Sequence, residues 1–185
     1  MRIVAGARRG ARLYTGKAPG FRPTSDRVRE AIFDILGGLT EGRRVLDLFA
    51  GSGALGFEAL SRGALEALFV EKSRRIAGWI ERNGRDLRFD DRITVHASDA
   101  VRFLKRGEEL EKYDLLFADP PYGAGLVRPA LEGIAAIPGP RRVVLERDRR
   151  EDPGIPRTGW RRAAAYGDTV VEFLSFGESP EEESR

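Results

Sequence analysis

The 185-residue chain has no cysteine and no glutamine, and it has a single histidine. The absence of cysteine excludes a disulfide framework, thiolate metal sites and thiol nucleophiles. No stretch approaches the roughly 18 uninterrupted apolar residues of a membrane-spanning helix, and residues 1–6 lack the apolar block of a signal peptide. We therefore expect a soluble, cytoplasmic protein without a membrane partner.

The length of the chain suits one folded domain, because domains commonly have about 150 residues. Hydrophobic residues make up 41% of the chain and charged residues 33%, which provides for an ordinary core and argues against general disorder. We predict a basic arm at residues 1–23, a domain at 24–177 and an acidic, disordered tail at 178–185.

Positive charge is concentrated near the start of the chain. Residues 1–29 contain eight arginines and lysines against one aspartate, a net charge of +7, whereas the whole chain carries +3 and the remainder −4. Such a segment suits a polyanionic partner, because contacts to phosphates release counterions and steer association. A solvated, solubilising surface is the alternative interpretation.

Short apolar runs alternate with helical patterns after a first helix that Thr24 or Ser25 can cap. The predicted strands are 45–49, 67–71, 93–97, 113–118 and 143–145, and the predicted helices 54–61, 74–87, 100–105 and 126–135. Residues 160–166 and 169–176 follow without a helix between them and predict a hairpin. The chain is therefore expected to be α/β, with a mostly parallel sheet that binds ligands beyond the carboxyl ends of its strands.

A glycine motif follows the first predicted strand. Residues 51–56 read G-S-G-A-L-G, and Glu71 lies 20 residues after Gly51 at the end of the next strand, where a ribose diol is usually held. Backbone can approach a ligand closely where no Cβ intervenes. A tight turn without a ligand, and a merely solvated Glu71, are the alternatives.

Asp47, which precedes the glycine motif, indicates which kind of nucleoside the motif would bind. A pyrophosphate at the start of the next helix would be repelled by this carboxylate, whereas the ammonium and sulfonium of S-adenosylmethionine would be attracted. A structural carboxylate that accepts backbone N–H groups is an alternative that could coexist. Asp99 could accept from the adenine amino group or cap the helix that starts at Ala100.

The most specific motif is Asp119-Pro120-Pro121-Tyr122, at the end of the fourth predicted strand. The prolines stiffen the turn and remove N–H donors, Asp119 adds an acceptor, and Tyr122 offers a flat face for stacking. Together they suit a planar ring with an exocyclic amine, whose hydrogen bonds to Asp119 and to the Pro120 carbonyl would turn its lone pair toward a methyl donor. A capped Pro-Pro turn without a ligand is the alternative.

His96 lies at a strand end, and we interpret it as structural. No cluster of His, Asp and Glu has metal-ligand spacing, so no metal is expected.

With these motifs, the sequence resembles the bacterial 16S rRNA guanine-N2 methyltransferases. The resemblance covers roughly residues 2–176. It rests on residues 2–6 with Arg9, Gly10 and Leu13, on residues 22–30 and 46–56, and on the motif 119–122. It implies a Rossmann-like class I methyltransferase fold with a seven-stranded sheet, S-adenosyl-L-methionine as cofactor, and rRNA of the small ribosomal subunit or its assembly intermediate as substrate.

The resemblance also implies roles for individual residues, with Glu71 on the ribose, Asp99 on the adenine and Asp119 to Tyr122 on the guanine. The predicted catalytic residues are Asp119, Pro120 and Tyr122. The predicted cofactor-binding residues are Asp47, Phe49, Gly51, Ser52, Gly53, Glu71, Lys72, Asp99 and Ala100. The predicted RNA-binding residues are Arg8, Arg9, Arg12, Arg22 and Arg27.

Two other functions remain open at this point. An adenine-N6 methyltransferase on RNA or DNA needs the same acceptors in its pocket, although no added recognition domain for duplex DNA is visible. A non-catalytic RNA-binding assembly factor could retain a nucleoside pocket, although Asp119 and the glycine motif favour an enzyme. We expect a monomer by default.

Overall fold

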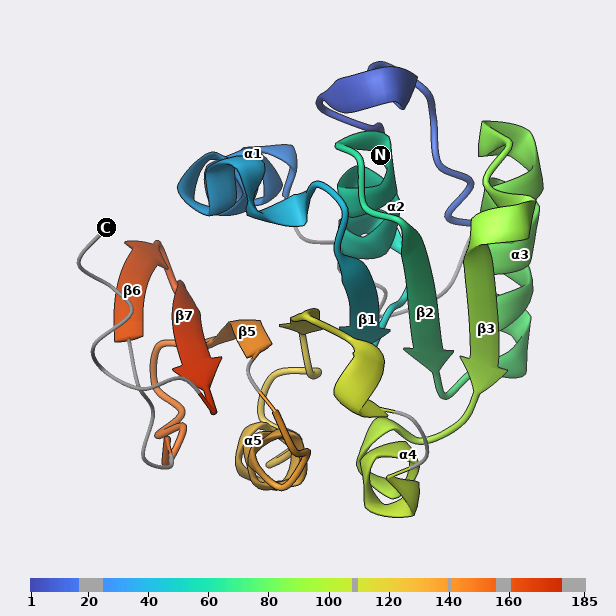
Figure 1. The fold of residues 1–185 in the computed structure, drawn as a ribbon. Helices are drawn as coiled ribbons and strands as arrows, with labels where there is room; N and C mark the ends of the chain where they lie inside the picture. Colours follow the sequence, from blue (N-terminus) through green and yellow to red (C-terminus); the bar gives the residue numbers. More distant parts are fainter. Residues whose placement is uncertain (17–24, 108–109, 140, 156–160, 178–185) are drawn as a thin grey trace.

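A computed structural model describes residues 1–16, 25–107, 110–139, 141–155 and 161–177. Its centre is a seven-stranded sheet with the order β3-β2-β1-β4-β5-β7-β6 (Figure 1). The strands are β1 (Arg44–Leu48), β2 (Glu66–Glu71), β3 (Ile93–Ala97), β4 (Leu115–Ala118), β5 (Arg141–Asp148), β6 (Arg161–Tyr166) and β7 (Thr169–Phe176). Strands β1 to β5 pair in parallel, and β7 is antiparallel to both β5 and β6. The predicted parallel sheet with a C-terminal hairpin is confirmed.

Helices cover both faces of the sheet, as near-continuous apolar strands require. One core cluster joins Val45, Phe69 and Phe117 to α1 (Asp26–Leu36), α2 (Ala54–Ser61) and α3 (Arg74–Leu87). The other joins Leu46, Leu48 and Leu116 to α4 (Ala100–Arg106) and α5 (Val127–Ala135). Within the described ranges, no helix combines the length and apolar character needed to cross a membrane.

Side-chain caps fix where the helices begin. The Ser25 hydroxyl accepts from the backbone N–H of Val28, so Ser25 caps α1. The helix ends at Leu36, earlier than the apolar pattern to Leu39 suggests, because Gly37 takes a positive φ of 54° and a 3-10 turn, Gly37–Thr40, follows.

The first 16 residues pack on the domain instead of extending from it. Arg2 and Arg12 form an isolated antiparallel bridge, and Ile3 and Leu13 are buried in the first core cluster. The fully buried carboxylate of Glu58 on α2 accepts the backbone N–H groups of Val4 and Ala5 at 2.7 and 2.9 Å. This part of the predicted basic arm therefore belongs to the folded unit. Residues 17–23 of the arm and the predicted tail at 178–185 lie outside the described residues.

Candidate active site

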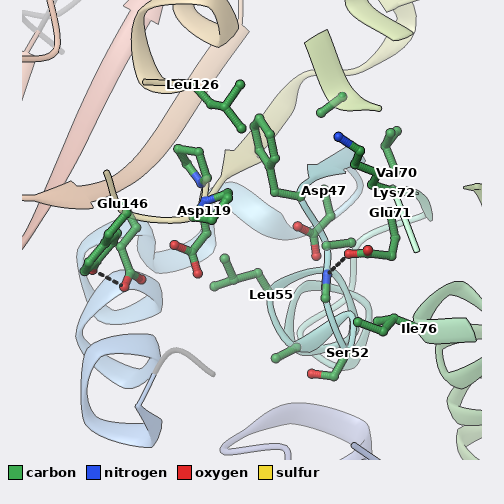
Figure 2. A pocket seen from close by; sticks show the side chains of 18 of the residues that line it. Asp47, Ser52, Leu55, Val70, Glu71, Lys72, Ile76, Asp119, Leu126 and Glu146 are labelled. Carbon is green, nitrogen blue, oxygen red and sulfur yellow. Dashed lines mark hydrogen bonds between the residues drawn. The ribbon is translucent and has the colours of Figure 1, made fainter. Parts of the chain in front are cut away.

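A cavity of about 810 Å³ opens at the carboxyl ends of the parallel strands. Strand register explains which side chains meet there: Ala118 of β4 pairs with Leu48 of β1 and with Leu145 of β5. The next residues along these strands, Phe49, Asp119 and Glu146, therefore start from the same edge, and all three line the cavity. Figure 2 shows Asp119 and Glu146 toward one side of the pocket, and Asp47, Glu71 and Ser52 toward the other.

Glu71 organises the glycine loop. One carboxylate oxygen accepts the backbone N–H of Gly51 at 3.0 Å (Figure 2). The other accepts that of Ser73 at 2.7 Å. These bonds to an ionised acceptor hold the loop after β1 against the loop after β2. Each oxygen keeps further acceptor capacity, so Glu71 remains suited to a ribose diol.

Asp47 is 2% exposed and accepts the backbone N–H of Gly56 at 3.0 Å. Burial raises the pKa of Asp47 to about 8; the bond from Gly56 opposes this rise and the charge of Glu71 adds to it. The carboxyl group therefore holds its proton more tightly than an exposed aspartate does. The structural role and an electrostatic role are both available, because Asp47 lines the cavity as well.

Two of the three motif glycines are required by packing. A Cβ on Gly56 would lie 2.3 Å from the ring of Phe69, and a Cβ on Gly53 would lie 2.7 Å from the ring of Phe57. Gly53 also has a positive φ of 80°. Gly51 and Ser52 line the cavity, whereas Gly53 is not among its lining residues.

Asp99 caps α4, one of the two roles left open by the sequence. Its carboxylate accepts the backbone N–H of Arg102 at 3.1 Å and lies 3.4 Å from the ammonium of Lys72. The bond from Arg102 is the main reason that the pKa of Asp99 lies below its usual value, and Lys72 adds to the effect. Asp99, Lys72 and Ala100 also line the cavity, so an adenine contact stays a prediction.

At the other end of the cavity, Tyr122 is held from two strands. Its hydroxyl donates to a carboxylate oxygen of Glu146 on β5 at 3.0 Å, the dashed line at Glu146 in Figure 2. The same hydroxyl lies 2.8 Å from the hydroxyl of Thr169 on β7. Burial is the main cause that raises the pKa of the Tyr122 phenol, so the group stays a neutral donor. The structure thus brings Asp119, Pro120 and Tyr122 into one cavity with a fixed aromatic ring.

Sequence reasoning missed Glu146 and Thr169. Glu146 directly follows the predicted strand 143–145, so a polar residue at the functional edge of the sheet was the available signal. Thr169 reaches the cavity because β7 pairs with β5, which the sequence did not indicate. His96 is exposed and packs against Phe103, away from the lining residues. Among the residues described, no group of acidic and histidine side chains could hold a metal ion.

Of the predicted RNA-binding arginines, the four that the structure describes, Arg8, Arg9, Arg12 and Arg27, are not among the residues that line the cavity. Arg9, Arg12 and Arg27 are exposed, whereas Arg22 falls outside the described residues. Arg8 is half-buried, donates to the Leu87 carbonyl at 2.7 Å and stacks on Phe89. Arg8 therefore helps to fix the N-terminal segment against the end of α3.

Known proteins match the chain along most of its length. The family model for Conserved hypothetical protein 95 matches residues 1–175. Ribosomal RNA small subunit methyltransferase D from Haemophilus influenzae is 37% identical over 132 residues, which cover 71% of this chain and 68% of that protein.

Solved structures agree with this family relationship. The Escherichia coli protein yhhF is 30% identical, with a TM-score of 0.81 over 97% of this chain and 98% of that one. An RNA methyltransferase from Salinibacter ruber, in complex with S-adenosyl-L-homocysteine, is 15% identical with a TM-score of 0.65 and supports the fold alone; the match covers 89% of this chain and all of that one. The predicted class I methyltransferase fold is confirmed. The chain belongs to the Conserved hypothetical protein 95 family, and the predicted resemblance to the small-subunit rRNA methyltransferases is confirmed.

Proposed function

We propose that the chain transfers a methyl group from S-adenosyl-L-methionine to the exocyclic N2 amine of a guanine in rRNA of the small ribosomal subunit. The observation that carries this proposal is that the glycine loop with Glu71 and the motif Asp119 to Tyr122 line one cavity. The small-subunit rRNA methyltransferase named among the relatives supports rRNA as the substrate.

S-adenosyl-L-methionine is the cofactor. The carboxylates of the cavity fit this cofactor. Glu71 offers acceptors for the ribose diol, Asp99 offers one for the adenine amine, and Asp47 offers a carboxylate for the cationic end. The buried carboxyl group of Asp47, whose pKa is raised to about 8, would be stabilised in its ionised form by that cation. When bound, the cofactor supplies an electrophilic methyl group on a sulfonium.

At the base end, the chain's own groups orient the amine. The Asp119 carboxylate and the Pro120 carbonyl accept the two N–H groups, and the ring of Tyr122 stacks on the base. These acceptors favour a pyramidal nitrogen and stabilise the positive charge that develops on it, an effect for which one contact can be worth about 2.7–4 kcal/mol. The proton is then lost to Asp119 or to water.

The arginines outside the cavity would hold RNA that flanks the target base. Arg9, Arg12 and Arg27 are exposed and suit contacts to phosphates, and Arg22 is assigned the same role from the sequence. Such contacts offset the few kcal/mol needed to splay a base out of folded RNA, and they read no sequence themselves. Arg8 contributes by fixing the N-terminal segment that carries Arg9 and Arg12.

The direct test is tritiated methyl transfer to small subunits that lack the modification, followed by nucleoside analysis. We expect N2-methylguanosine. N6-methyladenosine would instead favour the adenine alternative, and cofactor binding without any transfer would favour a non-catalytic assembly factor. The Asp119→Ala variant is the control that separates transfer by this site from a contaminating activity.

A further inference from the structure

Glu146 is a carboxylate of the cavity that the proposed mechanism does not use. Glu146 is the residue after Leu145 on β5, and Leu145 pairs with Ala118, the last residue of β4. Glu146 and Asp119 therefore follow paired residues of neighbouring strands. Glu146 is only 7% exposed, yet it lines the same cavity as Asp119. Tyr122, whose hydroxyl contacts Glu146, lines that cavity as well.

The orientation of Glu146 is fixed. One of its oxygens accepts the Tyr122 hydroxyl at 3.0 Å, and that hydroxyl is held in turn by Thr169 at 2.8 Å. A carboxylate can accept about four hydrogen bonds, so the bond from Tyr122 leaves acceptor capacity for a ligand. A fixed, nearly buried acceptor discriminates strongly, because a ligand without the matching donor leaves it unsatisfied.

The two candidate bases differ at the atom beside the reacting amine. Guanine carries an N1–H donor next to its N2 amine, whereas N1 of adenine is an acceptor next to the N6 amine. An ionised carboxylate accepts hydrogen bonds and donates none. A second carboxylate beside the one that holds the amine therefore complements guanine and repels the N1 lone pair of adenine.

We propose that Glu146 accepts the N1–H of the target guanine and is the residue that selects guanine against adenine. This proposal rests on the proposed function, since it concerns the same cavity and the same base. Asp119 holds the reacting amine, Tyr122 stacks on the ring, and Glu146 reads the neighbouring donor while it positions Tyr122.

The test uses a reconstituted small subunit in which the target guanosine is replaced by 2-aminopurine riboside. This base keeps the reacting amine but has an acceptor at N1. Wild-type protein should prefer guanine in kcat/KM by about tenfold or more, as loss of a hydrogen bond to a charged group predicts. In Glu146→Gln the amide oxygen can still accept from Tyr122 while the amide N–H can donate to N1, so the preference should shift toward 2-aminopurine by about tenfold or more.

Two further variants separate base reading from ring positioning. Thr169→Val removes a second hydrogen-bond partner of the Tyr122 hydroxyl without changing a group that reads the base. It should therefore lower kcat/KM for both substrates by the same factor. Glu146→Ala removes the repulsion toward N1 and should also raise the ratio of 2-aminopurine to guanine. Thermal melting and binding of S-adenosyl-L-homocysteine show whether Glu146→Gln folds. If it does not, the base preference of Glu146→Ala tests the proposal in its place.

An unchanged base preference in a folded Glu146 variant would overturn the role given to Glu146. Failure of the wild-type protein to methylate guanine N2 at all would overturn the proposed function instead. The two failures are therefore distinguishable.

Discussion

The two ends of the cavity are built in different ways. At the cofactor end, Glu71 and Asp47 bind backbone groups of the loops that the glycine motif and the β2 turn supply. At the base end, Tyr122 after β4 is held by side chains of two other strands, Glu146 of β5 and Thr169 of β7, which lie 24 and 47 residues further along the chain. The cofactor end is thus fixed by local loop geometry, and the base end depends on correct assembly of the C-terminal hairpin.

Asp119→Ala should separate the two ends most clearly, because it should lower turnover and leave cofactor affinity near normal. Loss of an acceptor aimed at the developing charge should lower kcat by about 100- to 1000-fold. The dissociation constant of S-adenosyl-L-homocysteine, measured by calorimetry, should stay near that of the wild-type protein, because Asp119 belongs to the base end. Retention of a tenth of wild-type turnover would remove Asp119 from the mechanism.

The converse change is Glu71→Ala at the cofactor end. It removes the acceptor for the Gly51 and Ser73 N–H groups, which is also the proposed acceptor for the ribose. Hydrogen bonds to charged groups contribute about 1.5–3 kcal/mol each. We expect cofactor affinity to fall by roughly 10- to 100-fold. Glu71→Gln, which keeps one acceptor oxygen, should lose less. Equal cofactor affinity in all three proteins would contradict the assignment.

Neutralising Arg9, Arg12 and Arg27 together should affect RNA binding alone. Each phosphate contact contributes about 0.7 to the log–log salt dependence with single strands, so the slope should fall by about two units. Filter binding of the small-subunit substrate across salt concentrations measures this slope. The affinity for S-adenosyl-L-homocysteine should not change, and an unaltered slope would mean that these arginines do not contact phosphates.

The protonation of Asp47 should have a smaller effect, a dependence of cofactor affinity on pH. Its pKa is raised to about 8, and a bound cation favours its ionised form, so binding of S-adenosyl-L-methionine should release a proton below that pH. Affinity should therefore rise with pH by up to about one log unit per pH unit and level off above pH 8. In Asp47→Asn the pH dependence should be lost; an identical slope in both proteins would assign the proton to another group.

The same raised pKa has a consequence for folding stability. Because Asp47 binds its proton more tightly when folded, its contribution to stability is complete below its ordinary pKa of 3.8 and is lost as the pH rises to about 8. Denaturant melts of the wild-type and Asp47→Asn proteins should therefore differ in their pH dependence between these two values. Parallel pH profiles would show that burial does not raise this pKa.

The difference between the two ends of the cavity also explains which residues could be predicted from the sequence. Hydrophobic periodicity and the caps predicted the strands, the helices and the hairpin, because these features are local. The residues of the cofactor end were predictable because the glycine motif and an acidic residue 20 residues after Gly51 form a recognisable pattern of fixed spacing. Glu146 and Thr169 were missed because their place in the site depends on strand order and register.

Packing also changed the meaning of two predicted features. The glycines at 53 and 56 suggested close approach of a ligand, but their neighbours are the rings of Phe57 and Phe69. The basic residues near the start of the chain suggested an arm for a polyanionic partner, and Ile3 and Leu13 of the same segment are in addition buried in the core. In both cases the decisive contact comes from a distant element, which a local pattern does not contain.

A crystal structure of the protein with S-adenosyl-L-homocysteine tests the central claim most directly. We expect the ribose hydroxyls on Glu71, the amino acid end near Asp47 and the sulfur facing Asp119 and Tyr122. A cofactor bound outside this cavity, or one whose sulfur points away from Asp119, would contradict the account.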